Sequence, residues 1–413
     1  MQALFKRIIC RVCLATRLEK ILTFGPTPLA NAFLTKDKID QPESYYPLDV
    51  SFCKACGFVQ LSHVVHPEIL FKDYVYASST SPVFVNHFKQ FAESVSKKYL
   101  PEKNSLVIDI GSNDGILLSP FQKLGYKTLG IEPAATVAKL ARRQDIETIE
   151  KYFSTSLAKD IVKKYGKAKV ITATNVFAHI DDLDEIITGV KTILSVDGVF
   201  IIEAPYLVDF LKKNYFDLVY HEHLSYWSID ALKRLLKRYD MDVFHVEKVT
   251  VHGGSIRVFV QKAKGIYPID KSVKNFLDLE KRNKVASLST FTTYAQKIQK
   301  NKIILLTLLA KLKTKGKTIA AYGAPAKGNT LLNFFSIGVE TLDFVVDDSP
   351  LKQGLYTPGK HIPVVSTETL YKKHPDYLLI LAWNFAQPIM QNHTAYKKAG
   401  GKFIVPVPKP QIV

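Results

Sequence analysis

The chain has 413 residues, of which 47% are hydrophobic and 23% are charged, the composition of an ordinary soluble globular protein. This length allows about two to four domains, and no apolar run reaches the roughly 18–20 residues that span a bilayer. The N-terminus runs directly into a pair of cysteines and lacks the form of a signal peptide, so we expect a cytoplasmic protein without a membrane segment.

The chain is strongly basic, with 56 Lys and Arg residues against 38 Asp and Glu residues and a net charge of +18. Such a charge indicates an anionic partner, either nucleic acid or a phosphorylated small molecule. Much of the lysine is scattered along the chain rather than packed into one block. A lysine-rich surface without a special partner therefore explains the charge equally well.

The four cysteines form two Cys-x2-Cys pairs within the first 56 residues, Cys10 with Cys13 and Cys53 with Cys56. Clustered cysteines in a cytoplasmic chain favour a metal over disulfides. Two such pairs place four thiolates at the corners of a tetrahedron, the geometry that zinc prefers, and four ligands leave no open position. We therefore predict a module over residues 1–72 that holds a structural zinc ion. The alternative is four free buried thiols.

The next segment has a helical pattern over residues 73–100, which Pro101 ends. Beyond it, short apolar runs alternate with helical stretches, which is typical of a doubly wound parallel sheet. The predicted apolar face of the helix consists of Val85, Phe88, Phe91, Ala92 and Val95. The expected strands are 105–110, 127–132, 170–173 and 199–203.

The first expected strand leads into the loop Asp-Ile-Gly-Ser-Asn-Asp-Gly, in which Asp109 precedes Gly111, Asn113 and Gly115. Glycines between a strand and a helix let the backbone approach a ligand closely. The spacing differs from the G-x-G-x-x-G of a dinucleotide site. It resembles the D-x-G-x-G-x-G loop of class I methyltransferases, with Asn113 in place of the middle glycine. The loop therefore predicts an S-adenosylmethionine site.

Two further polar residues are expected at the same edge of the sheet. Glu132 ends the second strand, where its carboxylate is placed to accept hydrogen bonds from the two ribose hydroxyls, and Asn175 follows a later strand, where it is predicted to face the methionine part of the cofactor. Asp109 and Glu132 together are more specific than the loop alone. A dinucleotide, or a fold that has lost its ligand, are the alternatives.

A third motif, Tyr-His-Glu-His-Leu-Ser-Tyr, occupies residues 220–226 and mixes polar with aromatic side chains. A histidine suits a general base because its pKa lies near the working pH. A neighbouring glutamate is able to fix the tautomer of the ring or to bind a substrate hydroxyl. The alternatives are a metal-binding pair, for which no third ligand is evident nearby, and a structural histidine.

The last third of the chain contains another nucleotide-binding pattern. Residues 270–313 are charged and contain no Gly or Pro, so we expect one long helix or a helical hairpin. A strand then begins at Lys317 and enters a glycine-bounded loop over 323–329 that carries Lys327. Such a loop at the start of a helix suits a pyrophosphate, and the alternative is a tight turn without a ligand.

Taken in order, the four motifs resemble the sugar C-methyltransferases of deoxysugar biosynthesis over essentially the whole chain. The resemblance implies an α/β fold in which a class I methyltransferase domain (73–265) stands between the zinc-binding module and a helical linker (266–314), followed by a C-terminal Rossmann-like domain (315–413) that binds the sugar nucleotide. The implied cofactor is S-adenosylmethionine. The implied substrate is a dTDP-4-keto-2,6-dideoxyhexose methylated at C3. We expect a monomer that binds neither nucleic acid nor a membrane.

The resemblance also assigns roles to individual residues. His223 matches the general base, Tyr220 and Glu222 match residues around the sugar, and Tyr76 matches an active-site tyrosine. Asn175 and His179 match residues that line the same cleft. The implied substrate-binding residues of the C-terminal domain are Tyr322, Lys327 and Lys352, with Tyr356 nearby. After Tyr76 the family usually has an aromatic residue or serine, whereas this chain reads Ala77-Ser78-Ser79, which affects the expected shape of the substrate.

Two functions of other classes compete with this one. A zinc-containing RNA methyltransferase would explain the basic charge and the cysteines, but the sequence has no continuous basic stripe with interleaved aromatic residues. A non-catalytic sugar-nucleotide binding protein would not need the complete set of Asp109, Gly111, Glu132 and His223.

Overall fold

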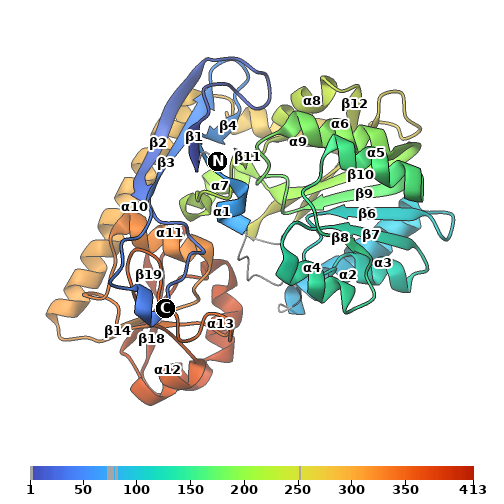
Figure 1. Cartoon of the computed structure of the whole chain (residues 1–413). Coiled ribbons are helices and arrows are strands. Elements are labelled where there is room, and N and C mark those ends of the chain that lie inside the picture. Colours follow the sequence, from blue (N-terminus) through green and yellow to red (C-terminus); the bar gives the residue numbers. More distant parts are fainter. Residues whose placement is uncertain (1–2, 72–78, 80–81, 251–252) are drawn as a thin grey trace.

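The computed structural model describes residues 3–71, 79, 82–250 and 253–413, and it has three parts (Figure 1). A slender N-terminal module lies alongside a long helix, a central α/β domain lies to one side, and a smaller α/β domain contains the C-terminus. In the described residues, no helix is both long enough and apolar enough to cross a membrane.

The N-terminal module is built on a four-stranded antiparallel sheet in the order β11-β4-β3-β2. Its edge strand β11 does not come from the module but from the middle of the chain, where it forms the end of the 220–226 motif. The elements of the module are β1 (Leu4–Lys6), β2 (Leu18–Thr27), η1 (Lys36–Lys38), β3 (Tyr46–Cys53), β4 (Val59–Leu61), β5 (His63–Val65) and α1 (Pro67–Phe71), with β11 (Ser225–Tyr226) added to them.

The central domain contains a seven-stranded sheet in the order β12-β13-β10-β9-β6-β7-β8. The five strands from β10 to β8 are parallel, whereas β13 is antiparallel to both of its neighbours. The elements of this domain are α2 (Pro82–Tyr99), β6 (Leu106–Ile110), α3 (Leu118–Lys123), β7 (Lys127–Ile131), α4 (Ala135–Arg142), β8 (Thr148–Ile149), α5 (Thr155–Tyr165), β9 (Ala168–Thr174), α6 (Leu183–Ile193), β10 (Leu194–Pro205), α7 (Leu207–Lys212), η3 (Phe216–Leu218), α8 (Ile229–Lys237), β12 (Met241–Val249) and β13 (Ser255–Lys262).

The expected strands of this domain are confirmed, while the first helix differs from its prediction. Helix α2 is described from Pro82 to Tyr99, and residues 73–78, 80 and 81 of the predicted stretch lie outside the described residues. Val85, predicted on the apolar face, is 46% exposed, because the larger Phe84 turns toward the core in its place together with Phe88 and Phe91.

Strand β6 occupies the centre of the sheet, and this determines where a ligand is able to bind. The chain moves outward from β6 to β7 and β8 and then returns to place β9 on the other side of β6. Ligands of such sheets bind where the strand order reverses, beyond the carboxyl ends of the strands. The ends of β6, β7 and β9 carry Asp109, Glu132 and Asn175.

The C-terminal part begins with two successive helices rather than with one long helix; the first contacts α8 and β12 of the central domain, and the second contacts β2 of the N-terminal module. Its six-stranded sheet has the order β16-β15-β14-β17-β18-β19, with only β19 antiparallel. The elements of this part are α9 (Lys271–Arg282), α10 (Leu288–Thr314), β14 (Ile319–Tyr322), α11 (Ala326–Phe335), β15 (Val345–Val346), β16 (Val364–Val365), α12 (Thr367–Lys373), β17 (Tyr377–Ile380), η5 (Trp383–Phe385), α13 (Ala386–Asn392), α14 (Thr394–Lys398), β18 (Lys402–Val405) and β19 (Gln411–Ile412).

One hydrophobic cluster is shared by all three parts and holds them together. The rings of Phe24 on β2 and Phe334 on α11 lie 4.3 Å apart, and Phe58 of the N-terminal module packs 5.0 Å from Trp227 of the central domain. A second cluster covers the opposite face of the central sheet. Because burial of apolar area is the main favourable term in folding, the three parts are stabilised as one body.

Candidate active site and zinc centre

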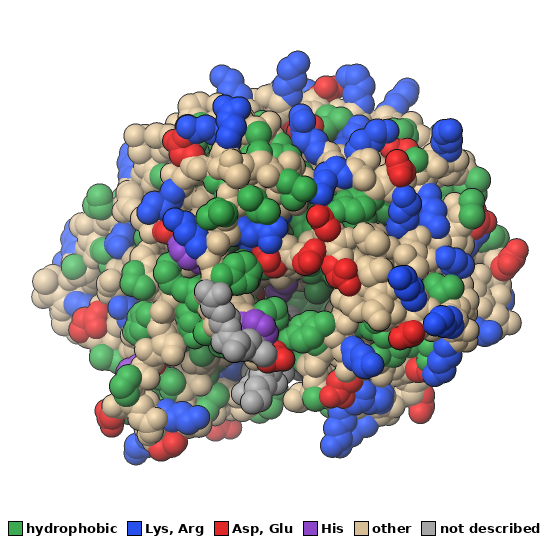
Figure 2. All heavy atoms as spheres, turned by 45° about the horizontal axis from the view of Figure 1, so that its top comes forward, with side chains coloured by type: hydrophobic (Ala, Val, Ile, Leu, Met, Phe, Trp, Pro, Cys, Tyr) green, Lys and Arg blue, Asp and Glu red, His purple; other side chains and the backbone are tan. Residues whose placement is uncertain are grey.

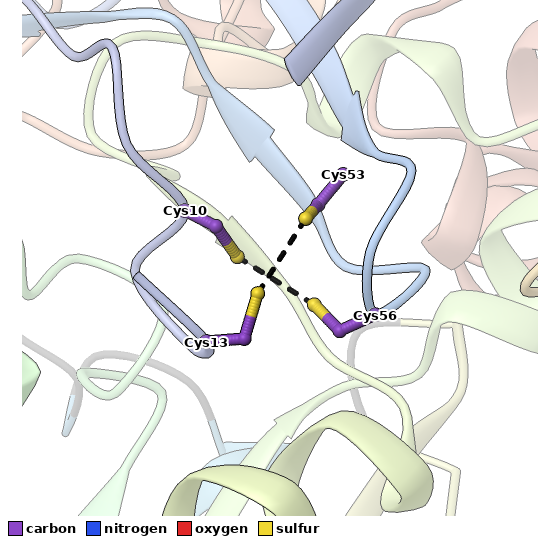
Figure 3. Close-up of side chains that lie close together, drawn as sticks. All are labelled: Cys10, Cys13, Cys53 and Cys56. Atoms are coloured by element: carbon purple, nitrogen blue, oxygen red, sulfur yellow. Dashed lines mark hydrogen bonds between the residues drawn. The ribbon is translucent and has the colours of Figure 1, made fainter. Parts of the chain in front are cut away.

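The four cysteine sulfurs converge on one point, although they come from two distant segments (Figure 3). They all lie within 4.8 Å of one another, and the pairs Cys10–Cys56 and Cys13–Cys53 are each separated by 3.6 Å between sulfurs. A tetrahedral zinc ion with Zn–S bonds of about 2.3 Å requires sulfurs about 3.8 Å apart. The geometry therefore fits zinc, and the four thiolates complete its coordination.

Both cysteine pairs are held in the same type of turn. The N–H of Leu14 donates to the carbonyl oxygen of Cys10, and the N–H of Gly57 donates to that of Cys53. Leu14 and Gly57 both have positive φ, 62° and 76°. A Cβ at Gly57 would lie 2.7 Å from the Cβ of Ala286, so only glycine fits there.

The loop after β6 has the backbone that its glycines predict. Gly111 has a φ of 72°, and a Cβ there would lie 2.7 Å from Cγ2 of Val176. Asn113 has a φ of 51°, and asparagine is one of the few residues that tolerate this left-handed conformation. Asn113 is therefore able to occupy the place of the middle glycine without changing the loop. Asp109 lies buried beneath the loop, where it accepts a hydrogen bond from the Thr172 hydroxyl at 2.6 Å and where burial raises its pKa to about 7.

Glu132 connects the loop to the next strand. Its carboxylate accepts the N–H of Asn113 at 2.9 Å and the N–H of Ala134 at 2.8 Å. A carboxylate oxygen has a second acceptor site, so both oxygens remain able to accept ribose hydroxyls. Nearby, the buried Oδ1 of Asn175 has no hydrogen-bond partner among the described residues. Buried polar atoms are almost always paired, so this orphaned oxygen supports a ligand at the edge of the sheet.

The motif over residues 220–226 directs its two histidines to different surroundings. Nδ1 of His223 lies 2.8 Å from the carbonyl oxygen of Leu218, which is only able to accept, so Nδ1 carries the proton. Nε2 then has a lone pair, and it accepts the hydroxyl of Tyr220 at 2.7 Å. His223 is 8% exposed and lines a small pocket together with Pro205. This is the arrangement of a general base with a fixed tautomer.

His221 faces the N-terminal module instead. Its Nε2 donates to the backbone oxygen of Tyr46 at 3.1 Å, and burial lowers its pKa to about 4. His221 is therefore a neutral residue at a domain contact.

Glu222 stands between the two histidines in the sequence. Its side chain is buried and contacts the N-terminal module. Its Oε1 accepts a hydrogen bond from the side-chain amide of Asn31 at 2.6 Å, and burial raises its pKa to about 7. Asn31 was not found from the sequence. It lies between the two cysteine pairs, and no sequence pattern indicates that this loop reaches a residue 191 positions away.

Replacing Glu222 with glutamine is expected to change how stability depends on pH. The native pKa of about 7 exceeds the ordinary value of 4.5. The protonated form of Glu222 stabilises the fold, and this contribution is complete below about pH 4.5 and is lost as the pH rises through about 7. Glutamine stays neutral and does not lose it. The difference in free energy of unfolding between Glu222→Gln and wild type should therefore rise by about 3 kcal/mol, in favour of the variant, between about pH 4 and pH 8. Urea unfolding at both pH values measures this. The exposed Glu150→Gln variant should show no such trend.

The remaining predicted catalytic residues are His179 and Tyr76. The ring of His179 lies 5.0 Å from that of His223 and stacks at 6.0 Å on Phe71. The structure therefore brings His179 together with the 220–226 motif. Tyr76 lies outside the described residues.

The three predicted substrate-binding residues of the C-terminal domain are all engaged within the protein. The Tyr322 hydroxyl donates to Asp348 at 2.8 Å, and the Lys352 ammonium donates to the carbonyl oxygen of Ala324 at 2.9 Å. Lys327 is buried, donates to Asn384 and lies 4.0 Å from the ring centre of Trp383. Burial lowers the pKa of Lys327 to about 8. Their role toward a substrate stays a prediction.

Asp217 is a further buried residue that sequence reasoning missed. It belongs to the central domain, it accepts the indole N–H of Trp383 from the C-terminal domain, and burial raises its pKa to about 6 against the opposing effect of Lys327. Asp217 and Lys327 are 110 positions apart in the sequence. Only the docking of the two domains makes them neighbours.

Three family models match consecutive parts of the chain. They describe a zinc binding domain over residues 10–71, a methyltransferase domain over residues 86–246, and a C-methyltransferase C-terminal domain over residues 250–408.

Individual proteins are also similar to this chain. The C-methyltransferase NovU of Streptomyces niveus is 35% identical over 98% of this chain and 96% of its own length. A ubiquinone biosynthesis O-methyltransferase of Bartonella quintana is 26% identical over 34% of this chain and 61% of its own length. A solved S-adenosylmethionine-dependent methyltransferase of Clostridium acetobutylicum is 14% identical and covers 43% of this chain and 92% of its own, with a TM-score of 0.36.

Proposed function

The chain belongs to the S-adenosylmethionine-dependent C-methyltransferases that carry an N-terminal zinc-binding domain, and we propose that it methylates carbon 3 of a nucleotide-linked 4-keto-deoxyhexose. The observation that carries this proposal is the fixed tautomer of the buried His223, whose Nδ1 donates to a backbone carbonyl and whose unprotonated Nε2 accepts the hydroxyl of Tyr220. A base of this kind suits removal of a proton from carbon.

The proposed reaction begins at the carbon beside the ketone. A C–H bond next to a carbonyl is acidic because its electron pair is able to move onto the carbonyl oxygen. His223 takes this proton on Nε2 and becomes an imidazolium, which then donates to the hydroxyl oxygen of Tyr220. Bound S-adenosylmethionine would supply the electrophilic methyl group: as the carbanion carbon bonds to the methyl carbon, the bond from that methyl to the sulfonium sulfur would break and leave S-adenosylhomocysteine. Hydrogen-bond donors near the enolate oxygen would stabilise its charge.

The other site residues are proposed to bind and orient the two ligands. Asp109, Gly111, Asn113 and Gly115 form the cofactor loop, and Glu132 and Asn175 receive the ribose and methionine parts. Around the sugar we place Tyr76, His179, Tyr220 and Glu222. Zinc on Cys10, Cys13, Cys53 and Cys56 has a purely structural role in this scheme, because its four ligands leave no open position.

We further propose that the domains divide at residues 72, 265 and 314 and that the enzyme acts as a monomer. Tyr322, Lys327 and Lys352 of the C-terminal domain are proposed to serve the nucleotide end of the substrate. The basic charge agrees with a phosphorylated small molecule rather than with RNA. The face of the molecule in Figure 2 supports a small-molecule partner, because its lysine and arginine side chains are spread out instead of forming one stripe.

The proposal is tested by incubating the enzyme with isotope-labelled S-adenosylmethionine and a panel of nucleotide-linked sugars with and without a 4-keto group. We expect mass spectrometry to find one labelled methyl on a keto sugar and none on its reduced counterpart. NMR of the product should locate the methyl at C3. Labelling of RNA, or of a sugar oxygen, would refute the proposal.

A further inference from the structure

Arg11 lies between the first two zinc ligands in the sequence, yet its side chain leaves the zinc module. It is 1% exposed, and its guanidinium contacts Asp181 of the central domain through Nε at 2.9 Å and Nη2 at 2.8 Å. Its Nη1 donates to the carbonyl oxygen of Leu61 at 3.0 Å. A fully buried guanidinium is retained only where it is paired and hydrogen-bonded, so this contact is specific.

Asp181 belongs to the loop that follows β9, and this loop contains two of the site residues. Asn175 begins the loop, and His179 lies two positions before Asp181. The loop also touches the 220–226 motif, because the carbonyl oxygen of Ala178 accepts the N–H of Ser225 at 3.1 Å. A guanidinium fixed on Asp181 therefore limits where His179 is able to lie.

The zinc module also holds the 220–226 motif directly. Ser225 and Tyr226 form the strand that pairs with β4 of the module, and the N–H of Leu61 donates to the carbonyl oxygen of Leu224 at 2.9 Å. Leu61 thus binds Arg11 through its carbonyl and the motif through its N–H. Both histidines that face each other across 5.0 Å are attached to the zinc module, each by its own segment.

The central domain also contacts the cysteine turn of the zinc module. Arg238, the C-terminal cap of α8, donates to the carbonyl oxygen of Val12 at 3.0 Å, and Val12 lies in the same cysteine turn. The backbone N–H of Arg11 donates to the side chain of Gln60 at 2.9 Å. The turn is therefore fixed on several sides, by the two thiolates that hold zinc and by these contacts.

From these contacts we propose that Arg11 is a positioning residue of the active site. The zinc-bound turn directs the guanidinium of Arg11 toward Asp181. This ion pair holds the loop 175–182 against the 220–226 motif, so that His179 and His223 face each other. The zinc module then contributes to catalysis by positioning these side chains, in addition to stabilising the fold. This rests on the proposed roles of His179 and His223, but not on the identity of the methyl acceptor.

The chain itself contains a matched control. Arg7 forms an ion pair with the same carboxylate at 3.0 Å, but it lies outside the cysteine turn and both side chains of the pair are 20% exposed. Arg11→Met and Arg7→Met thus remove the same charge from the same partner. Asp181→Asn keeps the shape of the partner and tests the link from the other side, should Arg11→Met fail to fold.

The test uses the full-length zinc-loaded enzyme with S-adenosylmethionine bound and no acceptor. NMR of ¹⁵N-labelled histidine rings should show that Arg11→Met and Asp181→Asn shift the signals of His179 and His223, while those of the distant His245 and His361 stay in place. Arg7→Met should shift none of them. With an accepted substrate, kcat should fall about 100-fold in Arg11→Met and Asp181→Asn and less than about fivefold in Arg7→Met.

The expected controls are one zinc per chain and a cofactor Kd within about threefold of wild type for every variant, since a misplaced histidine leaves cofactor binding intact. Unchanged signals of His179 and His223 in both Arg11→Met and Asp181→Asn would overturn the proposal, as would equal effects of Arg7→Met and Arg11→Met. If wild type methylates none of the sugars tested, the proposed substrate fails, and the ring signals still decide the role of Arg11.

Discussion

Replacing His223 with asparagine is expected to lower kcat for methyl transfer by about 10³-fold, within the range that a general base contributes. Asparagine keeps a polar side chain of similar length but has no nitrogen lone pair able to take the substrate proton. The loop over Asp109–Gly115 is separate from this residue, so the Kd for S-adenosylmethionine should stay near its wild-type value. Single-turnover assays with the accepted sugar, together with calorimetric titration of the cofactor, measure both quantities.

His221→Asn is the matched control for this variant. His221 lies two residues away in the same motif, but its ring donates to the backbone of Tyr46 and does not line the cavity of His223. Its replacement should lower the free energy of unfolding by about 1 kcal/mol through the lost hydrogen bond and leave kcat within a small factor of wild type. Equal losses of kcat in the two variants would show that His223 is not the base.

Replacing Cys53 with serine is expected to release the zinc and unfold the N-terminal module. A structural zinc site contributes about 10–16 kcal/mol to the folding of small zinc-binding units, and a hydroxyl replaces a thiolate poorly as a ligand. Zinc content should fall well below one per chain, and limited proteolysis should cleave within the first 65 residues. Because β4 pairs with β11 beside His223, turnover should be lost as well.

Ser51→Ala provides the control for the zinc variant. Ser51 is buried on the same strand β3, but its hydroxyl shares a hydrogen bond with that of Ser62 at 2.6 Å and is not a zinc ligand. It should retain one zinc per chain and resist proteolysis. A Cys53→Ser enzyme with full zinc content and full activity would contradict the four-cysteine centre.

The zinc ligands and the cofactor loop were predictable because each is formed by a short sequence motif. The spacing of Cys10, Cys13, Cys53 and Cys56 predicts a tetrahedral centre, and the structure brings their sulfurs within 4.8 Å. The Asp109–Gly115 loop and Glu132 were expected at the ends of adjacent parallel strands, because such strands align their carboxyl ends. In each case the residues of the site either lie close together in the sequence or are brought together by neighbouring parallel strands.

The orientation of the two histidines of the 220–226 motif was not predictable in the same way. His221 and His223 differ by two positions, and the surrounding backbone oxygens, from Tyr46 and Leu218, decide which nitrogen of each ring carries the proton, Nε2 in His221 and Nδ1 in His223. The sequence named His223 through a resemblance to known enzymes. The structure adds the physical reason, which is that Nδ1 must donate to a carbonyl.

The sequence by itself determined the order of the domains, the zinc ligands and the cofactor loop, because each depends on residue types at fixed short spacing. Tertiary structure decided the contacts between domains, such as Asn31 on Glu222, Asp217 beside Lys327, and Arg11 on Asp181. These pairs are separated by 110 to 191 positions. Their contacts depend on how the three parts of the structure pack around one hydrophobic core. No periodicity or motif in a single sequence predicts that packing.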